Sequence, residues 1–166
     1  MYPGKEIQMD EAKQDQEGGA GLYTLGLACC IGISVCGTYA QKAEPGEIRC
    51  DAFLAHLADG PLMEKTWQSL KSKVDRDKSN GLTDLKIRVC IVNPSTLKED
   101  KTPGMKWSQA IIIEQQKLND YYVIKATSLL TTTRRGSQKV DVQRHHINKE
   151  ADMQITSGRW MLILDA

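Results

Sequence analysis

The chain has 166 residues, of which 40% are hydrophobic and 26% are charged, a composition typical of one globular domain. Its formal net charge of +1 provides no overall field that would attract nucleic acid or an anionic membrane. A single phenylalanine among few aromatic residues offers no platform for stacking bases, so the composition argues against a nucleic-acid partner.

Residues 1–20 are polar, mixed in charge and end in a run of glycines and alanine. They contain no hydrophobic run behind a basic start, so they do not resemble a secretory signal peptide. We expect a mobile polar arm over residues 1–20, followed by a single α/β domain over residues 21–166. This organisation favours a cytoplasmic protein.

The cysteines number five, two of them are adjacent, and no CxxC pair occurs. Neighbouring cysteines rarely meet the geometry of a disulfide with each other, and zinc sites usually use paired spacings. We expect free thiols in an intracellular protein, with no metal and no other cofactor. One or two bridges would be compatible with an extracellular location.

Residues 18–41 carry no charged side chain, although the rest of the chain is rich in charge. β-forming residues and glycines in this stretch predict two short buried strands separated by a turn. The glycines and hydroxyl side chains dilute its apolar character and no basic cluster flanks it, so we do not expect a membrane span.

The middle of the chain has clearer periodicity. Pro45-Gly46 predicts a loop, and residues 50–58 predict a strand, with a helix as the alternative. A helix is predicted from Pro61 to Asn80-Gly81 because apolar residues recur at helical spacing, namely Met63, Trp67, Leu70 and Val74. A strand follows because apolar residues alternate, namely Leu85, Ile87, Val89 and Ile91.

The C-terminal part completes the prediction. Residues 93–104 predict a surface loop, and residues 107–119 predict a second helix, for which a strand is the alternative at Ile111 to Ile113. We expect strands at 121–130 and 140–145, joined by a hairpin turn at 131–139, and a buried terminal strand at 159–165. The sequence thus predicts an α+β fold, a mixed β-sheet or sandwich core with two principal helices packed on it.

Three histidines are available as a catalytic base. His145 and His146 are adjacent in a polar strand and point to opposite faces, so we expect a surface or structural role for them. His56 lies in an apolar run, where a buried imidazole needs a hydrogen-bonding partner. It is either a core histidine or a base that pairs with a cysteine of the uncharged stretch and lowers the pKa of that thiol.

The segments Thr24-Leu-Gly-Leu-Ala-Cys-Cys30-Ile-Gly-Ile33 and Phe53-Leu-Ala-His56-Leu57 resemble the chemoreceptor glutamine deamidases of the CheD type, and also bacterial toxins that deamidate host glutamines on the same scaffold. In that family a threonine lies six positions before the cysteine, aliphatic and small residues follow it, and a histidine lies in the next strand. The resemblance implies a CheD-like fold and a cysteine hydrolase that deamidates glutamine in a protein substrate. It implies a triad of Cys30, His56 and Thr24 and a thioester intermediate.

A shared site makes a geometric demand on this segment. In one straight strand Thr24 and Cys30 would be about 20 Å apart. The chain must therefore bend between them, and Gly26 and Ala28 are small enough to allow it. Such a turn would also direct backbone N–H groups to the space beside Cys30, as an oxyanion site requires.

Several alternatives stay open. Cys29 stands where the family usually has serine or glycine, and it is a second candidate nucleophile. A thiol protease or an acyltransferase would use the same Cys–His pair. A non-catalytic binding or effector protein on the same scaffold would keep Cys30 and His56 as packed core.

Overall fold

The computed structural model describes residues 2–130, 139–156 and 161–165 of the chain, and it has an α+β fold, as predicted. Its elements, in chain order, are β1 (Lys5–Glu6), β2 (Glu11–Gln16), β3 (Leu22–Leu27), β4 (Ile31–Tyr39), β5 (Cys50–Leu57), α1 (Met63–Ser79), β6 (Leu82–Val92), the 3-10 helix η1 (Pro94–Glu99), α2 (Gln109–Thr127), β7 (Lys139–His145), β8 (Ala151–Ile155) and β9 (Met161–Asp165).

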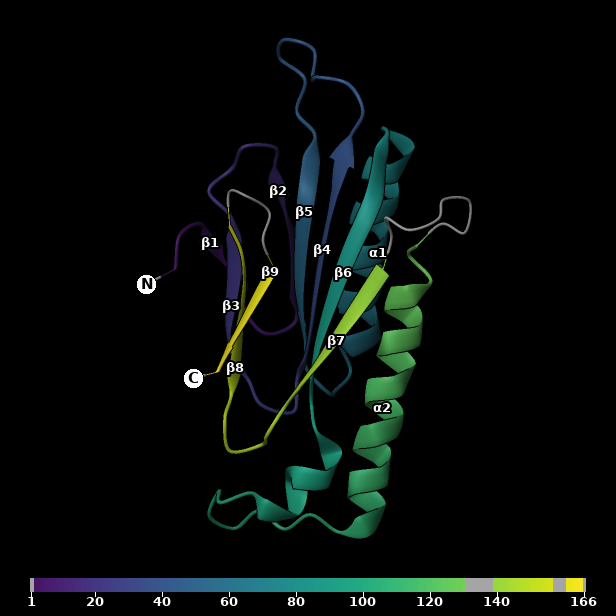
Figure 1. Cartoon of the computed structure of the whole chain (residues 1–166). Helices are drawn as coiled ribbons and strands as arrows, with labels where there is room; N and C mark the ends of the chain where they lie inside the picture. Colours follow the sequence, from purple (N-terminus) through teal and green to yellow (C-terminus); the bar gives the residue numbers. More distant parts are fainter. Residues whose placement is uncertain (1, 131–138, 157–160, 166) are drawn as a thin grey trace.

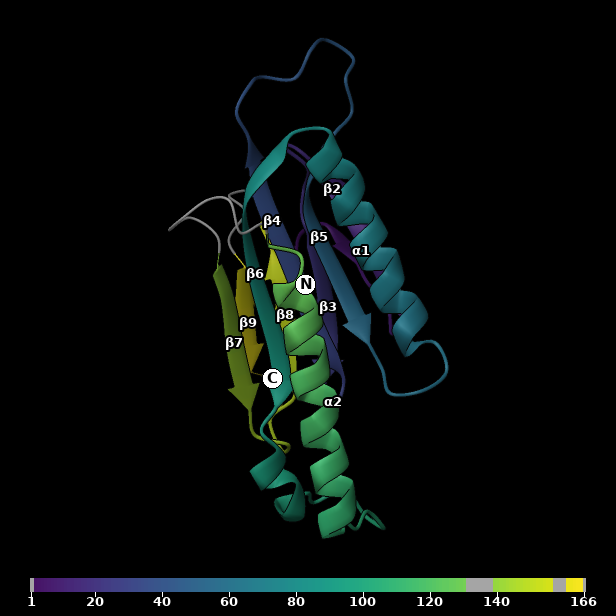
Figure 2. The same ribbon diagram turned by 90° about the vertical axis from the view of Figure 1, so that its right-hand side faces the viewer.

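The strands form two sheets that stack face to face (Figure 1). The smaller sheet has the order β1-β3-β8-β9, and the larger has the order β2-β5-β4-β6-β7. Both long helices cover the face of the larger sheet that points away from the smaller one (Figure 2). The chain therefore has two separate interior spaces, one between the sheets and one under the helices.

The space under the helices holds the larger core. Strand β4 contributes Ile31, Ile33 and Val35 to it, and α1 packs Trp67 and Leu70 against them. The apolar side of α1 follows the predicted helical spacing, and the helix ends at Asn80 and Gly81, where Gly81 takes a positive φ of 107°. The predicted first helix and the alternating strand after it are both confirmed.

The space between the sheets is narrow because a glycine lies at its centre. A Cβ atom on Gly32 would lie 2.3 Å from Met153 Sδ and 2.8 Å from Leu27 Cδ1, closer than real contacts allow. Leu27 and Met153 belong to the smaller sheet, and together with Leu54 and Cys90 of the larger sheet they form the inter-sheet cluster. Gly32 thus lets the two sheets approach each other.

We expect Gly32→Ala to lower the free energy of unfolding by about 1–3 kcal/mol, the usual cost of overpacking a core. Chemical denaturation measures the change. In a Met153→Ala background the same substitution is expected to cost less, because the clashing sulfur atom is gone. An equal cost in both backgrounds would show that the close approach of the sheets is not what requires glycine.

The N-terminal segment corrects the expectation of a mobile polar arm over residues 1–20. Strand β1 pairs with β3, and β2 forms the edge of the larger sheet by pairing with β5. Ile7 between them is only 1% exposed. The polar composition is explained because β2 is an edge strand whose side chains are half-buried, so that it lacks the apolar alternation of a central strand.

The second correction concerns residues 121–130. They were predicted to be a strand, but α2 continues to Thr127. Tyr122 and Ala126 are spaced one helical turn apart and are buried against the larger sheet, and this packing overrides the β propensity of the tyrosines and valine. The predicted partner strand exists as β7, but it pairs in parallel with β6. The predicted turn lies largely in residues 131–138, outside the described residues.

Two smaller points complete the comparison. The predicted loop at 93–104 contains η1, and Leu97 of that helix is fully buried. The terminal strand is present as β9, which pairs antiparallel with β8, while residues 159–160 of the predicted range lie outside the described residues. Within the described residues, neither long helix combines the length and the apolar character needed to cross a membrane.

Candidate active site

The segment between Thr24 and Cys30 bends, as a site shared by these two residues would require. Strand β3 has a register shift against β8 between Thr24 and Leu27. Gly26 in this bulge has a φ of 69°, and its N–H donates to Asp152 Oδ1 at 3.0 Å. The chain then leaves the smaller sheet after Leu27 and enters the larger one at Ile31. Residues 28–30 thus form the joint between the two sheets.

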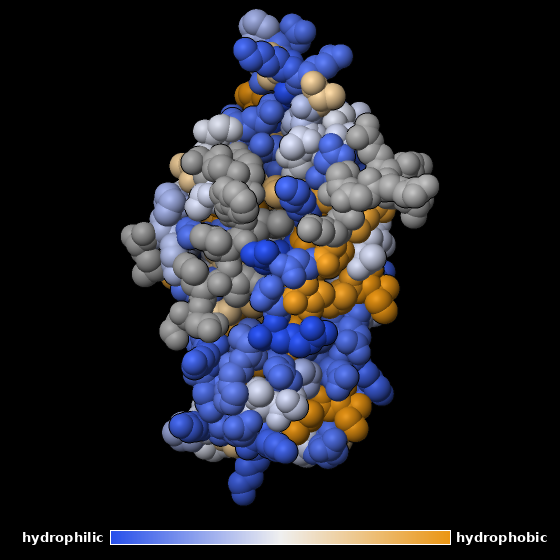
Figure 3. All heavy atoms as spheres, viewed as in Figure 1, coloured by the Kyte–Doolittle hydropathy of each residue, from blue (hydrophilic) through white to orange (hydrophobic). Residues whose placement is uncertain are grey.

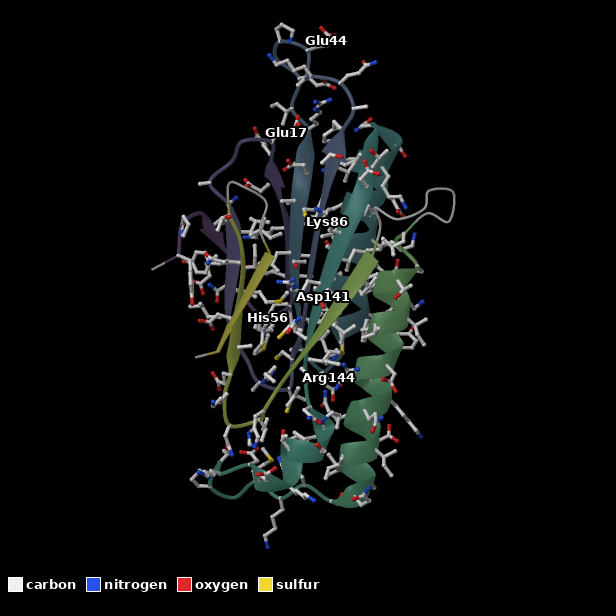
Figure 4. The ribbon with its side chains drawn as sticks, viewed as in Figure 1. Glu17, Glu44, His56, Lys86, Asp141 and Arg144 are labelled. Carbon is white, nitrogen blue, oxygen red and sulfur yellow. The ribbon has the colours of Figure 1, made fainter. Side chains whose placement is uncertain are left out.

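Thr24 and His56 meet inside the space between the sheets. Figure 4 labels His56 in this position. Thr24 is fully buried and His56 is 3% exposed. Thr24 Oγ1 lies 2.7 Å from His56 Nδ1, and the same hydroxyl donates to the backbone carbonyl of Ile7 at 2.7 Å. The contact that the sequence predicted between these two side chains is therefore present.

The two contacts of Thr24 determine the tautomer of His56. A hydroxyl has one proton, and the Ile7 carbonyl can only accept, so that proton is committed to Ile7. The Thr24 oxygen must then accept a hydrogen bond from Nδ1–H of His56. This leaves Nε2 with a free lone pair. Nε2 is buried and has no hydrogen-bond partner among the described residues.

The two adjacent cysteines lie on opposite sides of the joint. Cys30 packs against the inter-sheet cluster, and the register of β4 pairs Gly32, two residues further on, with His56. Cys29 instead packs against a cluster of Val92, Leu97 and Ile147, outside the inter-sheet space. The fold therefore puts Cys30, and not Cys29, on the side of Thr24 and His56. The structure does not join Cys30 to the pair by a hydrogen bond, since Nε2 of His56 is unpartnered.

Both candidate groups are uncharged in this environment. Burial raises the pKa of the Cys30 thiol, and the carboxylates of Asp10 and Glu150 act in the same direction. Burial lowers the pKa of His56, and Asp10 partly opposes this effect. The expectation that the imidazole lowers the thiol pKa is therefore not met. The site holds a protonated thiol and a neutral base, not a preformed ion pair.

The sequence analysis missed the contribution of the N-terminal segment to this site. Besides the Ile7 carbonyl, the N–H of Asp10 donates to the backbone oxygen of His56 at 2.9 Å. Asp10 has a φ of 65°, which is uncommon for a residue other than glycine. The only indication in the sequence that this segment is buried against the site was Ile7, an aliphatic residue between polar ones.

The remaining histidines and cysteines have structural surroundings. His145 is buried with Nδ1 3.1 Å from the carbonyl oxygen of His146, and its Nε2, like that of His56, has no hydrogen-bond partner among the described residues. His146 lies 3.5 Å from a carboxylate oxygen of Glu99. Cys36 is in the core, Cys50 starts β5, and Cys90 is covered by the smaller sheet. No disulfide and no group of three potential metal ligands occurs among the described residues.

A cavity of about 420 Å³ opens on the other side of the joint, next to α2. Its lining includes Cys29, Asp59, Trp107, Ile111, Gln115 and Leu118. Burial raises the pKa of Cys29 to about 11, so this thiol is protonated at neutral pH. Hydrophobic surface is visible on the side of the molecule that carries α2 (Figure 3), and Ile111, Ile113 and Ile124 of this helix are exposed.

Comparison with protein-family models finds no match, and comparison with curated proteins finds no significant match.

Proposed function

We propose that the chain is a cysteine-dependent amidohydrolase that deamidates glutamine side chains in a protein substrate, in the manner of the CheD-type enzymes that it resembles. The proposal depends mainly on one observation, the hydrogen-bonded pair of Thr24 and His56 with Nε2 unprotonated and unpartnered. A buried polar atom without a partner is costly, and His145 Nε2 is unpartnered as well. His56 differs from His145 because its Nδ1 is hydrogen-bonded to a threonine hydroxyl and because it lies on the side of the joint that carries Cys30. A base that must accept a proton needs this arrangement.

In the proposed first half-reaction, His56 Nε2 takes the proton of the Cys30 thiol while Sγ attacks the side-chain amide carbon of a glutamine. The carbonyl electrons move to the oxygen, which backbone N–H groups at the joint stabilise. The tetrahedral adduct collapses, the C–N bond breaks, and ammonia leaves with the proton from His56. The product is a thioester between Cys30 and the former glutamine side chain.

In the second half-reaction, His56 takes a proton from water while the water oxygen attacks the thioester carbon. The C–S bond breaks, glutamate is released, and the Cys30 sulfur recovers the proton. Thr24 keeps Nδ1 protonated throughout, so that Nε2 is always the nitrogen that exchanges the proton. The mechanism requires the Cys30 thiol to reach Nε2 when substrate binds, because catalytic contacts often tighten only in the substrate complex.

The other features of the proposal follow from the same chemistry. Free thiols accord with a reducing compartment, so we place the protein in the cytoplasm. The reaction as written needs no cofactor, no nucleic acid and no membrane. Its partner is the protein that presents the glutamine.

A second candidate is a non-catalytic binding protein on the same scaffold. It is favoured by the raised pKa of Cys30 and by the packing of this thiol against the inter-sheet cluster. In that case Cys30 and His56 serve only as core, and Cys30 reacts no faster than a buried thiol such as Cys90.

Ammonia release tests the proposed function. The purified protein is incubated with a mixture of glutamine-containing proteins, and mass spectrometry locates glutamines converted to glutamate. We expect ammonia and conversion at particular glutamines with the natural chain, and neither with Cys30→Ala. Cleavage of peptide bonds in place of deamidation would indicate a thiol protease. Equal ammonia from both proteins, or none from the natural chain, would contradict the proposal.

A further inference from the structure

Helix α2 carries two buried polar side chains on the face that packs against the sheet. Gln115 is 7% exposed and Asn119 is 1% exposed. Gln115 Nε2 donates to the backbone carbonyl of Cys29 at 3.2 Å and to Asn119 Oδ1 at 3.0 Å. Asn119 Nδ2 in turn donates to the carbonyl of Val92 at 3.0 Å. The two amides thus form a continuous hydrogen-bond network from the end of β6 to the joint.

The two end groups of this network determine the direction of its hydrogen bonds. Both terminal groups are backbone carbonyls, which can only accept hydrogen bonds. The amide nitrogen of each side chain must therefore point as described, and both protons of Gln115 Nε2 have an acceptor. A buried hydrogen-bond network of this kind restricts its members to one arrangement. Its consequence is that the Cys29 carbonyl is held toward α2.

The carbonyl of Cys29 belongs to the same peptide unit as the N–H of Cys30. In a trans peptide these two groups point in opposite directions, and no cis peptide occurs in the described residues. The Cys30 N–H therefore points away from α2, and it counteracts the rise in the pKa of the Cys30 thiol. It donates to no backbone acceptor in the described part of the chain. A backbone N–H thus lies beside the candidate nucleophile, close enough to act on its sulfur.

We propose that Gln115 is a positioning residue for the reaction at Cys30, because it holds the Cys29–Cys30 peptide with the Cys30 N–H directed at the developing oxyanion. The inference rests on the proposed function. Gln115 touches neither the substrate nor the reacting atoms. It acts only through the peptide unit, and Asn119 orients it.

The test compares two reagents that differ in their need for an oxyanion site. p-Nitrophenyl acetate acylates a thiol through a tetrahedral oxyanion, whereas iodoacetamide alkylates it by direct displacement. We expect Gln115→Met to slow acylation of Cys30 by about ten- to a hundred-fold and to change alkylation by less than about threefold. The control is Gln116→Met, the same change at the exposed neighbouring position, which is expected to leave both rates unchanged.

A second variant distinguishes the proposed positioning role of Gln115 from a folding defect. Asn119→Ala removes the acceptor that orients Gln115 and is expected to produce a smaller loss of acylation with the same selectivity. Circular dichroism shows whether each variant is folded. If acylation and alkylation fall equally, or if acylation is unchanged in both variants, Gln115 is only structural and the inference is overturned. If the natural chain is not acylated at Cys30 at all, the proposed function itself has failed, before any variant is compared.

Discussion

Cys30→Ala is expected to abolish the acyl-enzyme formed with p-nitrophenyl acetate and to abolish deamidation, whereas Cys29→Ala retains both. The physical reason is the side of the joint on which each thiol lies. Cys30 packs against the inter-sheet cluster, where His56 and Thr24 meet, and Cys29 lines the α2 cavity with Trp107. Loss of a nucleophile costs about 10⁴-fold or more in turnover. Intact-mass spectrometry detects the acyl group, and peptide mapping locates it.

The pair of alanine variants is its own control, because the two cysteines are adjacent and both are half-buried. Their thermal unfolding should differ little. An acyl group found on Cys29 in the natural chain would reverse the assignment of the nucleophile. Equal acylation of both thiols, at the rate of a small-molecule thiol, would support the binding-protein candidate in its place.

The pH dependence of acylation is the second prediction, because the mechanism starts from a protonated thiol and a neutral base. The reactive form requires unprotonated His56. Burial lowers the pKa of His56 below its ordinary value of about 6.5, so the neutral form persists into more acidic solution. We therefore expect the acylation rate to fall on acidification with a midpoint below pH 6.5 and to be constant through neutrality. Stopped-flow release of p-nitrophenolate measures the profile.

Two variants separate the role of the base, His56, from the role of Thr24, which orients it. His56→Ala is expected to lower the rate by about 10²–10⁴-fold and to remove the acidic limb of the profile. Thr24→Val keeps the shape of the side chain but loses both hydrogen bonds, so we expect a smaller loss with the acidic limb retained. An unchanged acidic limb in His56→Ala would exclude His56 as the base. A rate that instead follows the thiol titration alone would indicate a preformed thiolate.

The sequence was most informative where one physical requirement determined the pattern. The first helix followed from apolar residues such as Trp67 and Leu70 at helical spacing, because only one face is buried. Strand β6 followed from the alternation of apolar residues that face the helices, although its last four residues are buried on both faces. The bend around Gly26 and Ala28 was predicted from the shared site that the family resemblance implied, since a straight strand would have kept Thr24 away from Cys30. The Thr24–His56 contact followed from the family resemblance, which implied the pairing.

The rest depended on interactions between segments that are distant in sequence. Residues 121–127 have local β propensity, and only the packing of Tyr122 and Ala126 on the larger sheet makes them helical. The pKa of Cys30 is raised by its burial and by the carboxylates of Asp10 and Glu150, all of which only the fold brings about. Gln115 has no recognisable motif around it, because its role depends on the carbonyl that it meets.

The carbonyl of Ile7 is a member of the site that mutational scanning would overlook. Every residue type supplies a backbone carbonyl oxygen, whatever its side chain. No single substitution at position 7 therefore deletes the acceptor of the Thr24 proton. Removing residues 1–10 does delete it, while Cys30, His56 and Thr24 all remain. The Thr24 hydroxyl would then be free to donate to His56 Nδ1, which would move the ring proton to Nε2. A trimmed chain would thus keep all three side chains and yet present the wrong nitrogen to the thiol.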